Sequence, residues 1–163
     1  MTRDIMDFIE YIHNEKQTSK NTEVSYERDL RKLNEYLAGQ NICDAAAVTE
    51  TNLNAYVMFL EREGRKPATV SRSIASMKAF FHFLERERRI EADPAWRLKA
   101  PKIEKTMPRI LTTEEVTLLL EQPSGNTPKE LRDKAMLELL YATGIRVSEL
   151  ISLKISDLNL QME

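Results

Sequence analysis

The chain has 163 residues, of which 42% are hydrophobic and 31% are charged, and it contains only four glycines. This length allows one ordinary domain, or a small domain with part of another, and the composition is typical of a protein rich in amphipathic helices. No apolar run approaches the roughly 18 residues that a membrane span needs, and acidic residues near the start argue against a signal peptide. The single cysteine, Cys43, has no partner within the chain. We therefore predict a cytoplasmic protein in which Cys43 is a small core residue.

The net charge of −2 hides an uneven distribution along the chain. Residues 1–61 contain six Lys/Arg against eleven Asp/Glu, residues 62–109 contain thirteen against six, and residues 110–163 contain five against nine. A basic middle between acidic flanks indicates a face that binds a polyanion. Charge alone explains the pattern equally well as a set of solvated helix faces.

Apolar residues recur at helical spacing in four successive segments of the first 90 residues. The four stripes are Ile5, Phe8, Ile9 and Ile12; Tyr26, Leu30, Leu33 and Leu37; Leu53, Tyr56, Val57 and Leu60; and Val70, Ile74, Met77, Phe81 and Leu84. Ser19 or Asn21 suits a helix N-cap, Gly39 and Gly64 suit helix ends, and Pro67 suits a first helical turn. Four such helices can bury a shared core, which predicts a compact all-α domain.

The pattern changes after the fourth helix. Residues 91–109 contain three prolines and several lysines, which is typical of an extended, basic linker. We place the helical domain at 1–99, the linker at 100–109 and a further helical part at 110–163.

Capping-box spacing predicts two helices in that last part, one from Thr112 with Glu115 and one from Thr127 with Glu130. Gly144 suits the end of the second. The following "VSELISLKISDL" is expected to form another short helix.

Two helices of the first domain carry hydroxyls and cations opposite their apolar stripes. Side chains of these types can donate to phosphate oxygens and reach base edges. For any single residue a solvated helix face is the simpler interpretation, and only the combination of two such helices with a basic linker indicates DNA. The residues are Thr22, Ser25, Arg28 and Lys32 on the second helix, and Lys66, Thr69, Arg72 and Ser76 on the fourth.

Other chemistry finds little support in the sequence. His13 and His82 are far apart, and we see no cysteine or carboxylate at ligand spacing. There is no glycine-rich phosphate loop and no recognisable nucleophile elbow. We therefore predict no metal and no cofactor.

The stretch "GIRVSEL" places Arg146 in an apolar turn, three residues before Glu149. One interpretation is a local ion pair across one helical turn. The other is a phosphate-binding guanidinium that Glu149 holds from behind, suited to a phosphate whose charge grows in a transition state. The residues alone leave both open.

The longer stretch "LLYATGIRVSELISLKISDL" closely resembles the segment around the first catalytic arginine of tyrosine recombinases, the phage integrase family, and in particular its Xer-like members. Upstream, "LTTEEVTLLL" resembles the opening of the family's catalytic domain. "SKNTEVSYERDLRKLNEYL" and "KPATVSRSIASMKAFFHFLERERRIEADPAWRLKAPK" resemble its N-terminal, SAM-like core-binding domain and linker. The resemblance covers essentially the whole chain and implies a clamp around double-stranded DNA.

The resemblance also implies roles for individual residues. Arg146 would contact the scissile phosphate and Glu149 would support it. The polar faces of the two helices would approach the major groove, and Lys102 and Lys105 would follow phosphates from the linker.

Family enzymes need further catalytic residues downstream of this match, including a nucleophilic tyrosine. None of the tyrosines present occupies that position: Tyr11, Tyr26, Tyr36, Tyr56 and Tyr141. We therefore predict an N-terminal fragment with a complete core-binding domain and a truncated catalytic domain, which binds DNA but does not cleave it. A regulatory DNA-binding protein and a helical protein-interaction module are the alternatives. Apolar side chains of the truncated part should be exposed and should find a partner, either full-length protomers or a second copy: Leu139, Leu140, Leu150 and Leu153.

Overall fold

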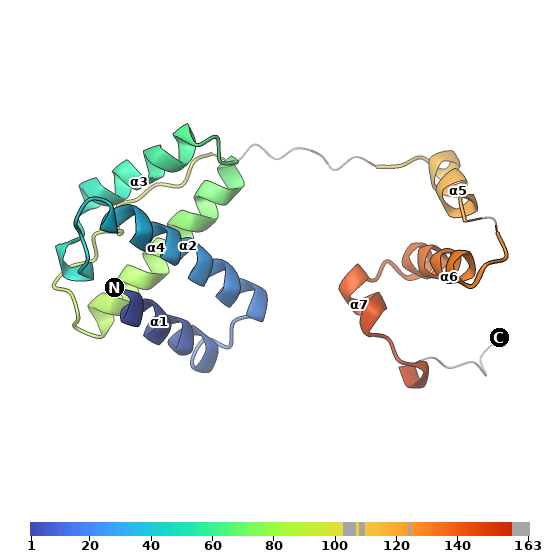
Figure 1. Cartoon of the computed structure of the whole chain (residues 1–163), viewed down its shortest axis with the longest axis horizontal. Helices are drawn as coiled ribbons and strands as arrows, with labels where there is room; N and C mark the ends of the chain where they lie inside the picture. Colours follow the sequence, from blue (N-terminus) through green and yellow to red (C-terminus); the bar gives the residue numbers. More distant parts are fainter. Residues whose placement is uncertain (103–106, 108–109, 124, 158–163) are drawn as a thin grey trace. The chain divides into compact units, whose positions relative to one another are not determined.

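The structure is a computed structural model that describes residues 1–102, 107, 110–123 and 125–157. Helices are the only regular elements in this part of the chain. The chain divides into two compact units, Met1–Lys105 and Thr106–Glu163 (Figure 1). The division falls inside the stretch that the sequence predicts as a linker. No helix in the described ranges is both long enough and apolar enough to cross a membrane.

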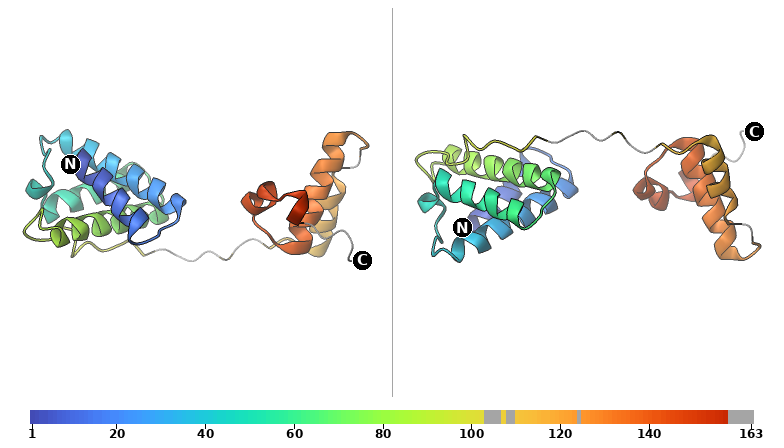
Figure 2. Two further views of the ribbon diagram at one scale, coloured as in Figure 1. Left: turned by 90° about the horizontal axis from the view of Figure 1, so that it is seen from below. Right: turned by 90° about the horizontal axis from the view of Figure 1, so that it is seen from above.

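Residues 1–102 of the first unit form four α-helices and one short 3-10 turn. These are α1 (Thr2–Asn14), α2 (Lys20–Ala38), η1 (Ala45–Ala47), α3 (Glu50–Arg62) and α4 (Pro67–Arg86). Helix α4 contacts α1, α2 and α3, and Figure 2 shows α3 lying alongside it. The apolar faces of all four helices therefore meet around α4, as the four predicted stripes require.

Aromatic and aliphatic side chains fill this core. Phe8 of α1 meets Phe80 of α4 edge to face, with 5.6 Å between the ring centroids. Leu30 and Leu33 of α2 and Leu53 of α3 are fully buried. Burial of a large apolar side chain contributes about 1.5–3 kcal/mol, so these core contacts stabilise the helical domain.

Local signals place the helix ends. Ser19 is the N-cap of α2 and accepts a hydrogen bond from the Thr22 backbone N–H. Pro67 opens α4, where its missing N–H costs nothing. Gly64 follows α3 in the left-handed conformation, with φ of 70°.

The segment after α4 packs against the first unit before the chain leaves it. Ile90, Ala95 and Leu98 are buried in the common core, and Lys78 of α4 donates to the carbonyl oxygen of Trp96 at 3.1 Å. The prediction of an extended linker from residue 91 onward is therefore wrong for its first part, because Ala95 and Leu98 anchor it to the core.

The second unit contains α5 (Thr113–Glu121), α6 (Pro128–Thr143), α7 (Val147–Ser152) and the turn η2 (Ile155–Asp157). Both predicted capping boxes are present, at Thr112 and at Thr127. Gly144 ends α6 in the left-handed conformation, with φ of 66°.

Burial differs sharply between the two units. In the described part of the second unit, Leu150 is the one buried hydrophobic residue, whereas Leu118 and Ile151 are 61% and 72% exposed. The prediction that Leu150 is exposed is wrong, because it packs within this unit. Leu153 is 40% exposed, as expected, and Leu139 and Leu140 are half-buried.

Cys43 is also placed differently from expectation. It is exposed rather than buried, because it lies in the connection between α2 and η1, and Ala45 and Val48, further along the chain, supply the core contacts.

Candidate nucleic-acid interface

A hollow of about 240 Å³ opens between α2, α3 and α4. We call it the basic hollow. Four of the residues predicted to contact DNA meet here, from two helices that are far apart in sequence. Its lining consists of Arg28, Asp29, Lys32, Tyr56, Leu60, Arg65, Thr69, Arg72 and Ser73.

The lining divides into a buried floor and a charged rim. Asp29, Tyr56 and Ser73 are at most 5% exposed and form the floor. The cations Arg28, Lys32 and Arg65 are exposed and form the rim, and none of the three forms an ion pair with a carboxylate of the described residues. The rim therefore carries positive charge that no ion pair among the described residues offsets, above a buried floor.

Arg72 connects floor and rim. Its Nε donates to Asp29 Oδ2 at 2.9 Å and its Nη2 donates to Asp29 Oδ1 at 3.0 Å. The Asp29 side chain is 5% exposed and that of Arg72 is 38% exposed. Hydrogen bonding to Asp29 raises the pKa of the guanidinium above its ordinary value. This bidentate geometry is the strong form of a carboxylate–arginine pair.

Tyr56 forms part of the floor as a neutral phenol. Burial raises its pKa to about 12, and the nearby Asp29 carboxylate adds to the effect. The ring is 1% exposed and lies 5.0 Å from that of Tyr36, centroid to centroid. Tyr56 thus supports the hollow structurally rather than offering an ionisable group.

Sequence reasoning missed three polar members of the hollow, Asp29, Arg65 and Ser73. Arg65 follows Gly64, whose left-handed conformation reverses the chain between α3 and α4. Its place beside Lys66, which we did predict, was the available signal. Asp29 lies between predicted cations on α2, and helical spacing alone gives no reason for a carboxylate there to be buried.

Ser76 corrects the predicted polar face of α4. It is 0% exposed, and its hydroxyl donates to the Ser73 carbonyl oxygen at 2.8 Å. Ser76 adjoins Met77 and lies three residues after Ser73 and four before Phe80, all of them buried. The core contacts more of α4 than the predicted stripe suggested, so Ser76 is unavailable to a ligand.

The other predicted DNA-contacting residues lie outside the hollow's lining. Thr22 and Ser25 are half-exposed on the first half of α2, and the Thr22 hydroxyl shares a 2.9 Å hydrogen bond with Ser19. Lys66 is the exposed N-cap of α4. Lys102 is exposed, and Lys105 lies outside the described residues.

In the second unit, Arg146 and Glu149 form an ion pair, as their spacing suggests. Arg146 is the N-cap of α7, and its backbone N–H donates to Glu149 Oε2 at 2.8 Å. Its Nη1 donates to Glu149 Oε1 at 2.9 Å, with the arginine side chain 82% exposed. Glu149 thus fixes both the backbone and the head group of Arg146, while most of the guanidinium stays open to solvent.

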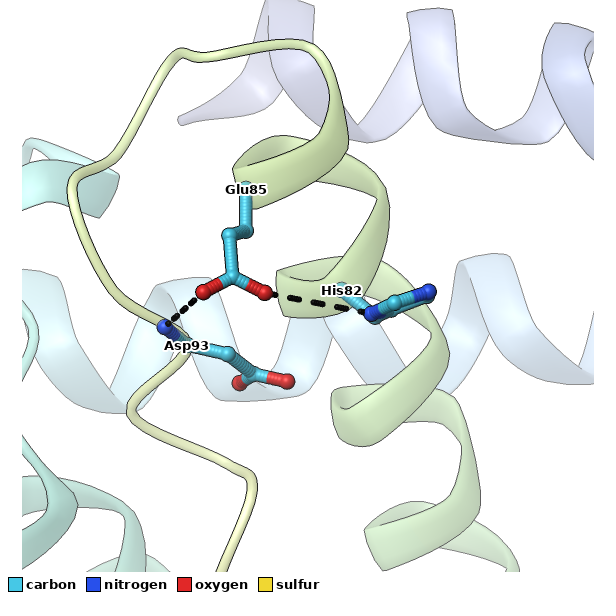
Figure 3. A group of neighbouring side chains, drawn as sticks. All are labelled: His82, Glu85 and Asp93. Carbon is cyan, nitrogen blue, oxygen red and sulfur yellow. Dashed lines mark hydrogen bonds and ion pairs between the residues drawn. The ribbon is translucent and has the colours of Figure 1, made fainter.

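One further polar group lies at the end of α4. Ligand atoms of His82, Glu85 and Asp93 lie within 4.8 Å of one another (Figure 3). The prediction that no carboxylate stands at ligand spacing from a histidine is therefore wrong, since Glu85 follows His82 by three residues. Both carboxylates already bind backbone: Glu85 accepts from the Asp93 N–H at 3.3 Å, and Asp93 accepts from the Ala95 N–H at 2.7 Å. These bonds explain the group as an anchor for the segment after α4.

Comparison with known proteins defines the class to which this fold and these sites belong. Residues 5–88 match the family described as phage integrase, N-terminal SAM-like domain, and residues 109–163 match the phage integrase family. The chain therefore belongs to the phage integrase family, the tyrosine recombinases, and combines the SAM-like N-terminal domain with part of the catalytic region.

Individual relatives support this family assignment. A tyrosine recombinase-like protein of Caldanaerobacter subterraneus is 46% identical over 94% of this chain and 53% of its own length. Tyrosine recombinase XerD of Listeria innocua is 39% identical over 97% of this chain and 54% of its own length. The chain thus spans about half the length of the curated relatives it matches. The solved structure of the Tn1549 transposon integrase, in complex with circular intermediate DNA, has the same fold, with a TM-score of 0.71 at 21% identity over 97% of this chain and 51% of that one.

Proposed function

We propose that this chain is the DNA-binding portion of a site-specific tyrosine recombinase, and that the basic hollow contacts duplex DNA. One observation carries the proposal: α2, α4 and the loop before α4 bring exposed cations and a half-exposed hydroxyl, that of Thr69, to one hollow. Cations without carboxylate partners suit phosphate oxygens, and a helix surface of this kind can enter a major groove. The related Tn1549 integrase was solved with DNA.

The rim cations and the residues near them would contact different parts of the DNA. Arg28, Lys32 and Arg65 would neutralise phosphates, while Thr69 and Arg72 would lie nearest the bases. Thr22 and Ser25 of α2, Lys66 beside Arg65, and the linker residues Lys102 and Lys105 would extend the contact along the DNA backbone.

In the whole protein, Arg146 would contact the scissile phosphate and Glu149 would hold it in place. A guanidinium that is fixed on one side and open on the other suits a phosphate that gains charge in the transition state. Cleavage through a phosphotyrosine link would belong to the whole protein, because this chain carries no tyrosine at the nucleophile's position. Incubated with a nicked recombination site, the chain should form no covalent adduct, and an adduct on a denaturing gel would contradict this division.

Salt dependence of DNA binding tests the interface. The affinity of the full chain for a labelled duplex should fall with a log–log slope of about −0.9 per phosphate contacted. Lys32→Ala and Arg65→Ala should each make the slope shallower by about 0.9. Lys16→Ala, an exposed cation just beyond the end of α1, is the matched control and should leave it unchanged.

Two results would refute the proposed interface. No binding even at low salt would favour a helical protein-interaction module. Equal slopes for all three variants would place the DNA elsewhere on the chain.

A further inference from the structure

A buried carboxylate in a surface that binds polyanions needs an explanation. Asp29 repels phosphate, and removing a charge from water costs several kcal/mol unless it is paired. The rim cations would attract DNA more strongly without it. Asp29 therefore weakens the general attraction of the basic hollow for DNA, and its role must lie elsewhere.

The pair with Arg72 indicates that role. Asp29 engages Nε and Nη2 of the guanidinium, while Nη1 has no hydrogen-bond partner among the described residues. These two hydrogen bonds fix the plane of the guanidinium. The N–H groups that Asp29 does not bind belong to a side chain that lines the hollow. A rigid, planar fork is what recognition of a base edge requires, since guanine presents two acceptors at a set distance.

The distribution of charge around the hollow also favours a base-reading role for Arg72. The Arg72 charge is offset by Asp29, so the pair adds little to the sequence-independent attraction that phosphate contacts supply. Arg28, Lys32 and Arg65 lack such a partner among the described residues and supply that attraction. Because Arg72 is ordered before DNA arrives, less side-chain freedom is lost when it binds.

We propose that Asp29 is a positioning residue that holds Arg72 in the geometry for reading base edges, so that Arg72 sets sequence preference while the rim cations set general affinity. This inference rests on the proposed DNA-binding function. It differs from a purely structural tie between α2 and α4, which would stabilise the domain without affecting which sequences bind.

The test is selection of duplexes from a random library by the full chain, followed by affinity measurements on the selected and a scrambled duplex. Arg72→Lys retains the charge but loses the fork, and it should reduce the preference by about tenfold or more at nearly unchanged affinity for scrambled DNA. Asp29→Asn keeps the shape but releases Arg72, and it should reduce the preference equally although Arg72 is still present. Lys32→Ala, the matched control, should lower both affinities and leave their ratio unchanged.

Folding is checked by circular dichroism and thermal unfolding of each variant. Should Asp29→Asn fail to fold, Arg72→Lys decides, since its half-exposed ammonium can still neutralise Asp29. Wild-type preference in Arg72→Lys, or in a folded Asp29→Asn, would overturn this inference and leave the proposed function standing. So would a wild-type chain that binds DNA without any sequence preference, whereas a wild-type chain that binds no DNA would remove both.

Discussion

Tyr56 shows how a single buried side chain contributes to the response of the domain to alkaline pH. Its phenol keeps its proton up to a pKa of about 12 in the folded chain, against about 10 in an unfolded one. Between these values the unfolded chain binds fewer protons than the folded one, so stability is complete below about pH 10 and falls as pH rises toward 12. The loss should reach about 2–3 kcal/mol.

Urea unfolding of wild type and Tyr56→Phe at several pH values measures this effect. The free energy of unfolding of wild type should fall more steeply, by about 1.4 kcal/mol per pH unit within this window. The two proteins are otherwise identical, so contributions from the rest of the chain cancel in the difference. If the free energies of unfolding of the two proteins changed in parallel with pH, the pKa of Tyr56 would not be raised.

At the scale of elements, most of the helix boundaries follow from caps that act within a few residues. Ser19 accepts the Thr22 N–H at 3.3 Å, and Ser19→Ala should cost about 1 kcal/mol. In a domain of this size that lowers the melting temperature of the first unit by about 4–8 °C. Lys20→Ala changes the neighbouring exposed residue without removing a cap, and it should melt within a degree or so of wild type. Equal melting temperatures for the two variants would mean that the cap contributes nothing to stability.

Gly144 ends α6 and sets the path of the chain toward Arg146. Its φ of 66° lies in the left-handed region, and a Cβ there would meet no other atom within 4 Å. Gly144→Ala should therefore destabilise the second unit by about 1–2 kcal/mol through backbone strain alone. Urea unfolding followed in that unit, with Ala142→Gly as a comparison in the last turn of α6, separates strain at Gly144 from ordinary helix propensity. An unaffected midpoint for Gly144→Ala would show that the junction tolerates another conformation.

At the scale of the whole molecule, the two units differ in how much apolar surface they bury. The first has a continuous core, whereas the second exposes Leu118, Leu119 and Ile151 by 45–72%. An apolar surface of this extent tends to be covered by a partner. We expect amides of α5–α7 to exchange with deuterium faster than those of α1–α4, and the chain to self-associate as its concentration rises.

Hydrogen exchange and analytical ultracentrifugation measure these two properties. Leu118→Glu should weaken self-association, whereas Glu114→Gln on the same helix should not. A concentration-independent monomer with equal protection in both units would contradict the prediction.

Sequence alone determined the α-helices and the family, because those depend on short-range physics and on a contiguous motif. Apolar periodicity, the caps at Ser19, Thr112 and Thr127, and the Gly-Ile-Arg-Val-Ser-Glu-Leu stretch all act or are recognised within a few residues. The candidate site was predicted less well. Arg28, Lys32, Thr69 and Arg72 do meet at one hollow, since opposite faces of amphipathic helices are readable from spacing.

Only the tertiary structure decided which polar residues remain accessible and which charges meet. Ser76 is buried because the core wraps further around α4 than a single stripe predicts. Asp29 and Arg72 lie 43 residues apart, and their pair exists only because α2 packs against α4. Arg65 joins the hollow through a left-handed turn at Gly64. Burial and pairing are properties of several elements packed together, so no local pattern along the chain specifies them.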